Sequence, residues 1–509
     1  MKKKGMVYLV GAGPGDAGLL TLRGAELLGR ADVVVYDALV NSDLLRLAPK
    51  TAEIIFGGKR ASEHAIPQDE LNALLISRAR DGKTVVRLKG GDPYVFGRGG
   101  EEAEQLALEK IGFEVVPGVS SFTAAPSYAG IPLTHREHSS AFTVITGHED
   151  PEKDASIDWT QVAKMPGTKI VMMATQRMGD LSQRLIAGGM SADTPVAMVS
   201  WGTTGQQRTI EGTLVTIGDV VTRENFRPPS LAVIGEVVRL RKKLNWFEHR
   251  PLFGQRIVVT RTRNQASELS RQLIERGAEV IEVPTIRIEA PDDKQSFVEA
   301  LAAIGEYEWV IFTSPNGVAQ FFEYFFKSFD DIRAIGGLRI AAVGPATAAK
   351  VAEYHLKVDL MPEEFVSSKI AAAFVKYQDI ENVRMLLLRA QVANRELPES
   401  LEALGAILDD VAVYKTVPET EDPYGAAARL LAEGADWITF ASASSVENFH
   451  ARFNLSEFVK KFSRVRFASI GPETSKAINS LGLTAATEAN PHTIEGMVKA
   501  IETVARPAR

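Results

Sequence analysis

The second half of the chain repeats itself at a fixed spacing, and this repeat constrains the fold more than any other feature. VVTR at 258–261 returns as LLLR at 386–389, RGAEVIEVPTIRI at 276–288 as LGAILDDVAVYKT at 404–416, and EWVIFTSPNGV at 308–318 as DWITFASASSV at 436–446. These three pairs are 128 residues apart, and VGPATAAKV at 343–351 returns one residue out of register as IGPETSKAI at 470–478. The unit is too long for a solenoid repeat and long enough for a domain.

Each copy reads as a strand, a helix, a strand and then further strand–helix pairs. The pattern therefore predicts two pseudo-equivalent α/β lobes with a ligand site in the cleft between them. The first half alternates strands and helices without such a repeat. Its short apolar runs end in Gly, Asp or Ser, at 32–37, 84–93, 113–121, 142–147, 168–174, 194–200 and 230–238. Because functional loops gather at the carboxyl ends of parallel strands, we expect a site built from many strand ends.

Composition excludes several classes of protein. A chain of 509 residues is too long for one hydrophobic core, and no apolar run approaches the roughly 20 residues of a membrane helix. The basic tip MKKK precedes a first strand that is too short for a signal peptide, so we expect a cytoplasmic protein. The net charge of −6, with dispersed Lys and Arg, argues against nucleic-acid binding.

The chain has no cysteine, which excludes disulfides, thiolate catalysis and Cys-ligated metal centres. His135 and His138 have the spacing of two metal ligands, but no supporting carboxylate pattern accompanies them. We therefore expect no metal.

The turn GAGPGD at 11–16 follows the first strand and resembles a dinucleotide fingerprint, but Asp16 occupies the position of the last glycine. Gly11 and Gly13 allow a tight turn and close approach of a ligand, whereas Pro14 removes a backbone donor. The residues alone leave nucleotide or nucleoside binding and a plain tight turn both open. GGDP at 90–93 likewise fits either a ribose or amino-group contact, or a turn in which Asp92 caps the next helix.

Five motifs occur together and in order: 6–40, FGGKR at 56–60, VVRLKGGDPYVFGRGGEE at 85–102, VVPGVSS at 115–121 and GIPLTHR at 130–136. They make residues 5–248 resemble the uroporphyrinogen-III C-methyltransferases of the tetrapyrrole methylase family. The resemblance implies two α/β domains that hold S-adenosylmethionine between them, and a homodimer. It implies a cofactor site at Pro14, Gly90, Gly91, Asp92, Val95, Ser120, Ser121, Met173 and Gly202.

The same resemblance assigns two catalytic residues. Asp37, at the end of DVVVYD, matches the family's proton acceptor, and Lys59 in GGKR matches its proton donor. A carboxylate near the ring can take the proton that a methylated pyrrole must lose. Without the resemblance, Asp37 also reads as a turn residue, and Lys59 as a solvated or substrate-binding lysine.

Residues 254–504 resemble uroporphyrinogen-III synthase through the ordered segments VVTR, GAEVIEVPTI, FTSPNGV, AVGPAT, LLLR, VYKTV, SIGPET and ATEANPHTIEGMVKAI. The resemblance implies a flavodoxin-like, two-lobed α/β fold in which each lobe combines parts of both repeats. Tyr414 matches the residue that assists loss of the substrate hydroxyl. Thr313, Ser314, Ser442 and Thr474 match positions that bind tetrapyrrole carboxylates, and Ala441 replaces a threonine. Helix N-caps in two copies of one fold would explain the same hydroxyl residues.

The sequence thus predicts an α/β protein with a methylase followed by a synthase. We expect methylase domains at 1–118 and 119–248, a linker at 249–254, one synthase lobe from 255–286 with 418–509, and the other from 287–417. The expected activity converts hydroxymethylbilane to uroporphyrinogen III and methylates it twice, giving precorrin-2. Alternatives are a second half that only binds tetrapyrroles, a non-catalytic tetrapyrrole or nucleoside sensor, and an NAD-binding protein.

Overall fold

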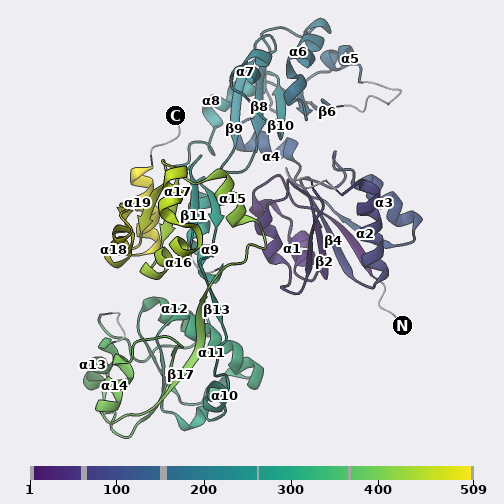
Figure 1. The fold of residues 1–509 in the computed structure, drawn as a ribbon. Helices are drawn as coiled ribbons and strands as arrows, with labels where there is room; N and C mark the ends of the chain where they lie inside the picture. The colour runs from purple at the N-terminus through teal and green to yellow at the C-terminus, as the bar shows by residue number, and fades with distance from the viewer. Residues whose placement is uncertain (1–4, 59–65, 149–156, 261–262, 365–367, 506–509) are drawn as a thin grey trace.

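The computed structural model of the protein describes residues 5–58, 66–148, 157–260, 263–364 and 368–505. Four five-stranded sheets, each covered by helices, organise these residues (Figure 1). None of the helices in these ranges is long and apolar enough to cross a membrane.

The first sheet is wholly parallel, with the strand order β3-β2-β4-β1-β5. Its strands are β1 (Met6–Gly11), β2 (Val33–Tyr36), β3 (Glu53–Phe56), β4 (Thr84–Lys89) and β5 (Gly112–Val116). Its helices are α1 (Leu22–Leu28), α2 (Gln68–Arg80) and α3 (Gly99–Leu108). All four residues of β2 are buried, as expected for a parallel strand that is covered on both faces.

The helix α4 (Ser121–Tyr128) leads to a second sheet of order β6-β7-β10-β8-β9. Its strands are β6 (Phe142–Thr146), β7 (Thr168–Met172), β8 (Pro195–Ser200), β9 (Arg208–Thr213) and β10 (Ser230–Ile234), with α5 (Trp159–Lys164), α6 (Met178–Ala187), α7 (Ile217–Arg223) and α8 (Arg241–Leu244). Only β6 and β7 pair in parallel. The carboxyl ends of β6, β7 and β8 therefore share one edge, while those of β9 and β10 lie at the other.

The third sheet is parallel, with the order β12-β11-β18-β19-β20. Its strands are β11 (Arg256–Val259), β12 (Glu279–Glu282), β18 (Trp437–Phe440), β19 (Arg466–Ser469) and β20 (Ala485–Glu488). Its helices are α9 (Arg263–Glu275), α15 (Ala426–Glu433), α16 (Ala443–Phe453), α17 (Leu455–Lys461), α18 (Pro472–Ser480) and α19 (Ile494–Val504). This sheet and its helices form lobe 1.

The fourth sheet, of lobe 2, has the order β13-β17-β16-β14-β15. Its strands are β13 (Ile286–Glu289), β14 (Trp309–Phe312), β15 (Arg339–Ala342), β16 (Arg384–Ala390) and β17 (Ile407–Pro418). Its helices are α10 (Gln295–Ala302), α11 (Pro315–Ser328), α12 (Pro345–Ala352), α13 (Ser368–Tyr377) and α14 (Glu396–Ala403). Only the pair β13–β17 is antiparallel.

The two lobes divide the sequence repeat between them. β11 and β12 of the first copy lie in lobe 1, whereas β14 and β15 of the same copy lie in lobe 2. In the second copy, β16 and β17 lie in lobe 2, and β18 and β19 lie in lobe 1. The orders β12-β11-β18-β19 and β17-β16-β14-β15 are therefore equivalent, and each lobe contains half of each copy.

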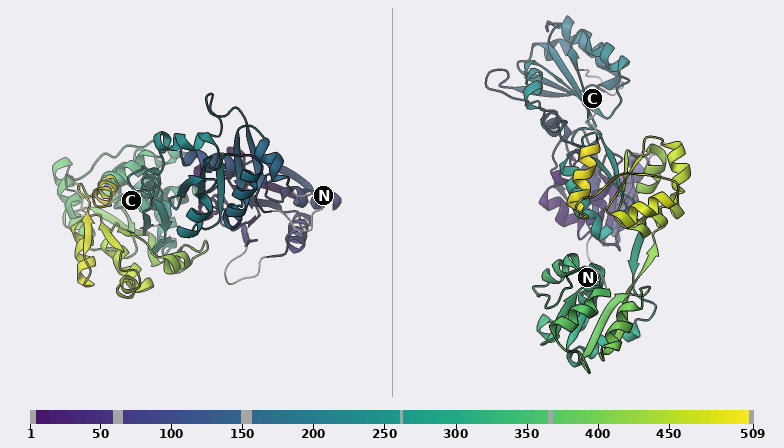
Figure 2. Two further views of the ribbon diagram at one scale, coloured as in Figure 1. Left: turned by 90° about the horizontal axis from the view of Figure 1, so that it is seen from above. Right: turned by 90° about the vertical axis from the view of Figure 1, so that its left-hand side faces the viewer.

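A two-stranded ribbon of β13 and the end of β17 joins the lobes (Figures 1 and 2). The chain leaves lobe 1 at the carboxyl end of β12 and leaves lobe 2 at the carboxyl end of β17. The carboxyl edges of the two sheets therefore both face the ribbon, which places the strand-end turns of both lobes on the side toward the other lobe.

Lobe 1 also contacts the first half of the chain. Arg46, in the 3₁₀ helix after β2, pairs with Glu282 at the end of β12. Gln206 pairs with Glu279, and a Cβ on Gly205 would lie 2.4 Å from the Glu279 amide nitrogen. The segment 249–254 between the halves packs closely, with Leu252 fully buried in the core of lobe 1.

Candidate active sites

The glycine turns at the ends of β1 and β4 are hydrogen-bonded to each other. The Gly13 amide donates to the Gly91 carbonyl at 3.2 Å, and the Gly91 amide donates to the Gly13 carbonyl at 2.8 Å. Both glycines have a left-handed φ, 77° and 69° respectively, which favours glycine over other residues. The turns GAGPGD at 11–16 and GGDP at 90–93 are therefore parts of one structure.

Gly118, which follows β5, lies against the same two glycine turns. A Cβ on Gly118 would lie 2.2 Å from the Gly91 carbonyl oxygen and 2.7 Å from Gly11 Cα, and a Cβ on Gly11 would lie 2.5 Å from Gly118 Cα. We call Gly11, Gly91 and Gly118 the glycine cradle. Neighbouring backbone occupies the Cβ positions of Gly11 and Gly118, and Gly91 has a left-handed φ, so all three positions favour glycine.

Asp92 joins two of these loops. Its Oδ1 accepts from the Tyr94 amide at 2.8 Å, and its Oδ2 accepts from the Gly118 amide at 3.0 Å. The next helix, α3, begins seven residues later with Arg98 as its N-cap, so the alternative in which Asp92 caps that helix is wrong. Asp92 stabilises the glycine cradle from the side.

Other predicted cofactor residues surround the glycine cradle. Pro14 and Gly90 follow β1 and β4, and Gly90 packs against Leu39. Ser120 and Ser121 begin α4, and no hydroxyl of theirs makes a hydrogen bond within the described part of the chain. Val95 lies in an exposed apolar run with Tyr94 and Phe96, whose exposed fractions are 55% and 46%. Exposed apolar side chains and the hydroxyls of Ser120 and Ser121 thus follow the same strand ends as the glycine cradle.

The second sheet contributes Met173 after β7 and Gly202 after β8. A Cβ on Gly202 would lie 2.3 Å from Ala125 Cβ in α4, so this turn packs directly on the helix that follows the glycine cradle. Met173 is half exposed and has a left-handed φ of 57°, and Trp201 and Thr203 also have left-handed φ values. Strained backbone of this kind clusters at functional sites.

Asp16 ties the two sheets together at this point. Its amide donates to Thr203 Oγ1 at 3.0 Å, and its carboxylate accepts from the Tyr128 hydroxyl at 2.8 Å. Burial and this carboxylate raise the pKa of Tyr128 above its usual range. Asp16, which occupies the position of the last glycine of the dinucleotide fingerprint, therefore links the first sheet to the second.

Asp37 lies at the end of β2, and its carboxylate is linked to a buried network. Its Oδ1 accepts from Arg87 Nη2 at 2.5 Å, while Arg87 Nε and Lys89 Nζ donate to Glu102 Oε1 at 3.1 and 2.8 Å. Burial, and then the positive charge of Arg87, lower the pKa of Lys89. Lys59, the predicted proton donor, lies outside the described residues.

Arg87, Lys89 and Glu102 were not singled out from the sequence. Their signal was present, because Arg87 and Lys89 interrupt the apolar strand VVRLK at alternate positions, which places both side chains on one face. Charges within a buried strand require partners, and Glu102 in the first turn of α3 supplies one.

In lobe 2, Ser314 caps α11, accepting from the Gly317 amide at 3.1 Å. The Tyr414 hydroxyl lies 2.9 Å from Ser314 Oγ, which joins the predicted catalytic residue of the synthase to a predicted carboxylate-binding residue. A β-bulge lies beside Tyr414, where the register with β16 shifts between Arg389 and Ala390. Bulges re-aim side chains next to active sites. Tyr414 itself is 7% exposed.

The equivalent turn in lobe 1 is built differently. Ser442 caps α16 within a capping box, and its Oγ lies 3.0 Å from Ser444 Oγ. Thr313 Oγ1 donates weakly to the Leu388 carbonyl at 3.4 Å, and Ala441 occupies the equivalent place. Thr474, near the start of α18, is 3% exposed and offers the least surface of the predicted set.

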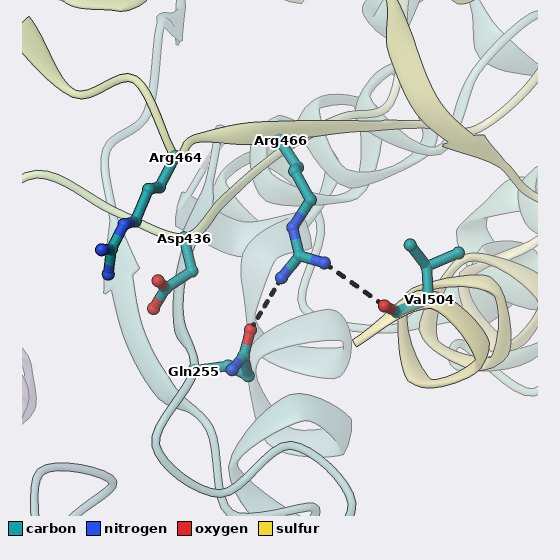
Figure 3. Close-up of a pocket in the computed structure, with 5 residues that line it drawn as sticks. All are labelled: Gln255, Asp436, Arg464, Arg466 and Val504. Carbon is teal, nitrogen blue, oxygen red and sulfur yellow. Dashed lines mark hydrogen bonds between the residues drawn. The ribbon is translucent and has the colours of Figure 1, made fainter. Parts of the chain in front are cut away.

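A cavity of about 600 Å³ lies at the opposite edge of lobe 1, lined by Gln255, Asp436, Arg464, Arg466 and Val504 (Figure 3). Apart from Val504, which ends α19, its residues precede or begin β11, β18 and β19, so the cavity lies at the amino ends of these strands. Arg466 donates to Gln255 and to the Val504 carbonyl and stacks over Trp437. This cavity is remote from the strand-end turns.

His135, Glu137 and His138 bring their ligand atoms within 4.8 Å of one another on the surface. His135 Nδ1 already accepts from the Glu137 amide at 3.2 Å. The absence of a metal remains a prediction.

Two α/β units in each half of the chain, with the predicted site residues at strand ends, define the class of fold. Residues 6–218 match the family "Tetrapyrrole (Corrin/Porphyrin) Methylases", and residues 267–499 match "Uroporphyrinogen-III synthase HemD". The porphyrin biosynthesis protein HemD of Ruminiclostridium josui is 39% identical over 447 residues, covering 88% of each chain.

A further relative and a solved structure are also similar to this chain. The uroporphyrinogen-III C-methyltransferase of Bacillus subtilis is 42% identical over 334 residues, which is 65% of this chain and 68% of the relative. A crystal structure of uroporphyrin III C-methyltransferase from Thermus thermophilus is 40% identical, covers 46% of this chain and 99% of its own, and has a TM-score of 0.39.

The chain belongs to the family of the Ruminiclostridium porphyrin biosynthesis protein: it is a bifunctional enzyme of tetrapyrrole biosynthesis, with a methylase followed by a uroporphyrinogen-III synthase. The resemblance and the α/β fold class that the sequence predicts are confirmed.

Proposed function

We propose that the second half cyclises hydroxymethylbilane to uroporphyrinogen III with loss of water, and that the first half transfers two methyl groups to this product, giving precorrin-2. The observation that carries the proposal is that predicted catalytic and binding residues lie at the ends of strands of the same sheet in each half. Asp37 is fixed beside the glycine cradle's sheet edge, and the Tyr414 hydroxyl lies 2.9 Å from Ser314 Oγ.

The residues at the glycine cradle fit S-adenosylmethionine, which supplies an activated methyl group on a sulfonium when bound. Glycine at these positions lets the ends of β1, β4 and β5 meet at one edge of the first sheet, and the nucleoside would bind against this edge. Pro14, Gly90, Asp92, Val95, Ser120 and Ser121 would line one side, and Met173 and Gly202 the other. The convergence of these residues on one sheet edge supports the cofactor assignment, and we propose that no metal takes part.

In the methylase, Asp37 would accept a proton. Methylation of a pyrrole carbon requires the ring to lose one proton, and a carboxylate within hydrogen-bond reach of the ring N–H can take it. The Asp37 side chain is 30% exposed, so it is open on one side while Arg87 holds the other. Lys59 remains the proposed proton donor.

In the synthase, Tyr414 would donate a hydrogen bond to the departing hydroxyl of hydroxymethylbilane. Thr313, Ser314, Ser442 and Thr474 would bind substrate carboxylates through hydroxyls and helix N-terminal amides. Because the substrate ionises readily, the two lobes mainly need to hold it in the fold that inverts the last ring. A small number of catalytic residues is sufficient for that task.

We also propose the domain limits given by the sequence, with methylase domains at 1–118 and 119–248, a linker at 249–254, and synthase lobes at 255–286 with 418–509 and at 287–417. The ribbon of β13 and β17 supports a lobe boundary near 286 and 418. A homodimer through the methylase half and a cytoplasmic location are further proposals.

The test is an anaerobic incubation with hydroxymethylbilane and S-adenosylmethionine, in which both the methyl count and the ring isomer of the product are determined. A dimethylated type III product is expected. A type III product without methyl groups would refute the methylase assignment. Methylated type I product alone would show that the second half only binds tetrapyrroles.

A further inference from the structure

Four charged side chains form a continuous network that runs from Asp37 into the interior of the first sheet. Asp37 contacts Arg87, Arg87 contacts Glu102, and Glu102 contacts Lys89. The side chains of Arg87, Lys89 and Glu102 are 3%, 3% and 0% exposed, whereas that of Asp37 is 30% exposed. Asp37 is therefore the one end of this network that a substrate can reach.

Fold stability alone does not account for these charges. Burying an ion costs several kcal/mol, and well-packed apolar residues in place of a buried ion pair are often at least as stable. Arg87 Nη1 and Glu102 Oε2 are also buried and make no hydrogen bond with the described residues. A network that leaves a donor and an acceptor unpaired is expensive, and such exceptions call for a functional explanation.

The network fixes the orientation of the Asp37 carboxylate. Arg87 Nε is held by Glu102 and Arg87 Nη2 by Asp37 Oδ1, so the planar guanidinium cannot rotate without breaking a charge-assisted bond. Lys89, and Gln68 at 3.3 Å, hold the same Glu102 oxygen. Within the described part of the chain, Asp37 Oδ2 accepts no hydrogen bond, which leaves this oxygen for a proton donor.

We propose that Arg87 is a positioning residue for methyl transfer, which holds Asp37 with Oδ1 engaged and Oδ2 directed to the substrate, and that Glu102 and Lys89 hold Arg87 in turn. The inference rests on the proposed role of Asp37. Arg87 is too deeply buried to touch a tetrapyrrole, so its effect must pass through the carboxylate.

The test compares Arg87→Ala, Arg87→Lys and Glu102→Gln with the wild-type chain in steady-state methylation of uroporphyrinogen III. Misplacement of a reacting group by about 1 Å can cost about a hundredfold in rate, so kcat should fall by about that factor in Arg87→Ala. The KM for uroporphyrinogen III should stay within about twofold. Arg87→Lys should remain impaired, because an ammonium cannot bond Asp37 and Glu102 in the same fork.

Chemical rescue separates positioning from folding. Millimolar guanidinium should restore part of kcat in Arg87→Ala and none in Asp37→Asn, since only the first variant lacks a guanidinium group. If Arg87→Ala does not fold, Glu102→Gln keeps the shape of the site and should lower kcat while S-adenosylhomocysteine affinity is retained. Synthase activity, measured on the same variant, shows whether the second half of the chain is still folded.

Arg78→Ala is the matched control. Arg78 donates two hydrogen bonds to Glu53 on the same part of the fold, but this pair is exposed and does not reach Asp37, so its kcat should match the wild type. An unchanged kcat in Arg87→Ala, a loss confined to KM, or a loss that guanidinium leaves unaltered would overturn the positioning role. A fully active Asp37→Asn would instead refute the proposed function of Asp37.

Discussion

The two halves of the chain build their sites by different means. In the methylase, three backbones meet without side chains at the glycine cradle, and a buried network of charges fixes Asp37. In the synthase, hydroxyl residues cap the first helical turns of two equivalent helices, α11 and α16. The first site depends on residues for which no substitute fits, whereas the second spreads its contacts over replaceable groups. Substitutions should therefore be far more damaging in the first half.

The synthase contains a second contrast, between its own two lobes. At the position that Tyr414 occupies in the second copy of the repeat, the first copy has Ile286. Thr313 is likewise matched by Ala441. The duplication preserved strands and caps but not chemistry, so one turn holds the tyrosine–serine pair and the other holds a plain capping box.

The largest expected effect is that of Asp37→Asn. Loss of a positioned acid or base typically costs about 10²- to 10⁴-fold, so methylation of uroporphyrinogen III should fall by that order. Formation of the type III isomer from hydroxymethylbilane should be unchanged, because the synthase site is built from other strands. A parallel loss of both activities would show that the halves do not work independently.

The next largest effect concerns the glycine cradle. In Gly118→Ala the added Cβ would lie 2.2 Å from the Gly91 carbonyl oxygen, so the three loops must move apart. We expect destabilisation of about 1–3 kcal/mol and at least a tenfold loss of S-adenosylhomocysteine affinity by calorimetry. Gly100→Ala is the control, since nothing lies within 4 Å of its added Cβ and alanine favours helix α3. Equal affinity in both variants would contradict the cradle.

A smaller effect is expected for Tyr414→Phe. Because the substrate ionises readily, the hydroxyl should contribute no more than the low end of acid catalysis, up to about a hundredfold in the rate of type III formation. Methylation of supplied uroporphyrinogen III should not change. The measurement is the ratio of type III to type I product, and a wild-type ratio would remove Tyr414 from the mechanism.

The smallest effects test the contrast between the lobes. Ser314→Ala and Ser442→Ala each remove a helix cap worth about 1 kcal/mol, so their thermal unfolding should shift by similar amounts. Only Ser314→Ala also frees the Tyr414 hydroxyl, and it should raise the KM for hydroxymethylbilane several-fold more than Ser442→Ala. Equal KM values would mean that both turns serve only as caps.

Much of this architecture could be predicted from the sequence, because the repeat, the strand-end turns and their order are local patterns. The hydrogen bond between Ser314 and Tyr414 spans 100 residues, and no local pattern contains such a contact. The mixture of parallel and antiparallel pairs in the second sheet could not be predicted either, because the sequence of an apolar strand does not reveal the direction of the strands beside it. Arg87 and Glu102 required the structure, because their pairing depends on how α3 packs on β4.

The exchange of strands between the lobes has a consequence for synthesis on the ribosome. Strand β11 cannot pair with β18 until β18 has been synthesised. The Arg256 amide at the start of β11 donates to the Asp436 carboxylate, which lies 180 residues later in the chain. At about 5–20 residues per second, translation separates these partners by about 9 to 36 seconds. All strands of lobe 2 emerge within that interval. The nascent chain therefore carries an unfinished half-sheet, with the apolar residues of β11 and β12 exposed, between a complete methylase and a lobe that can close before it.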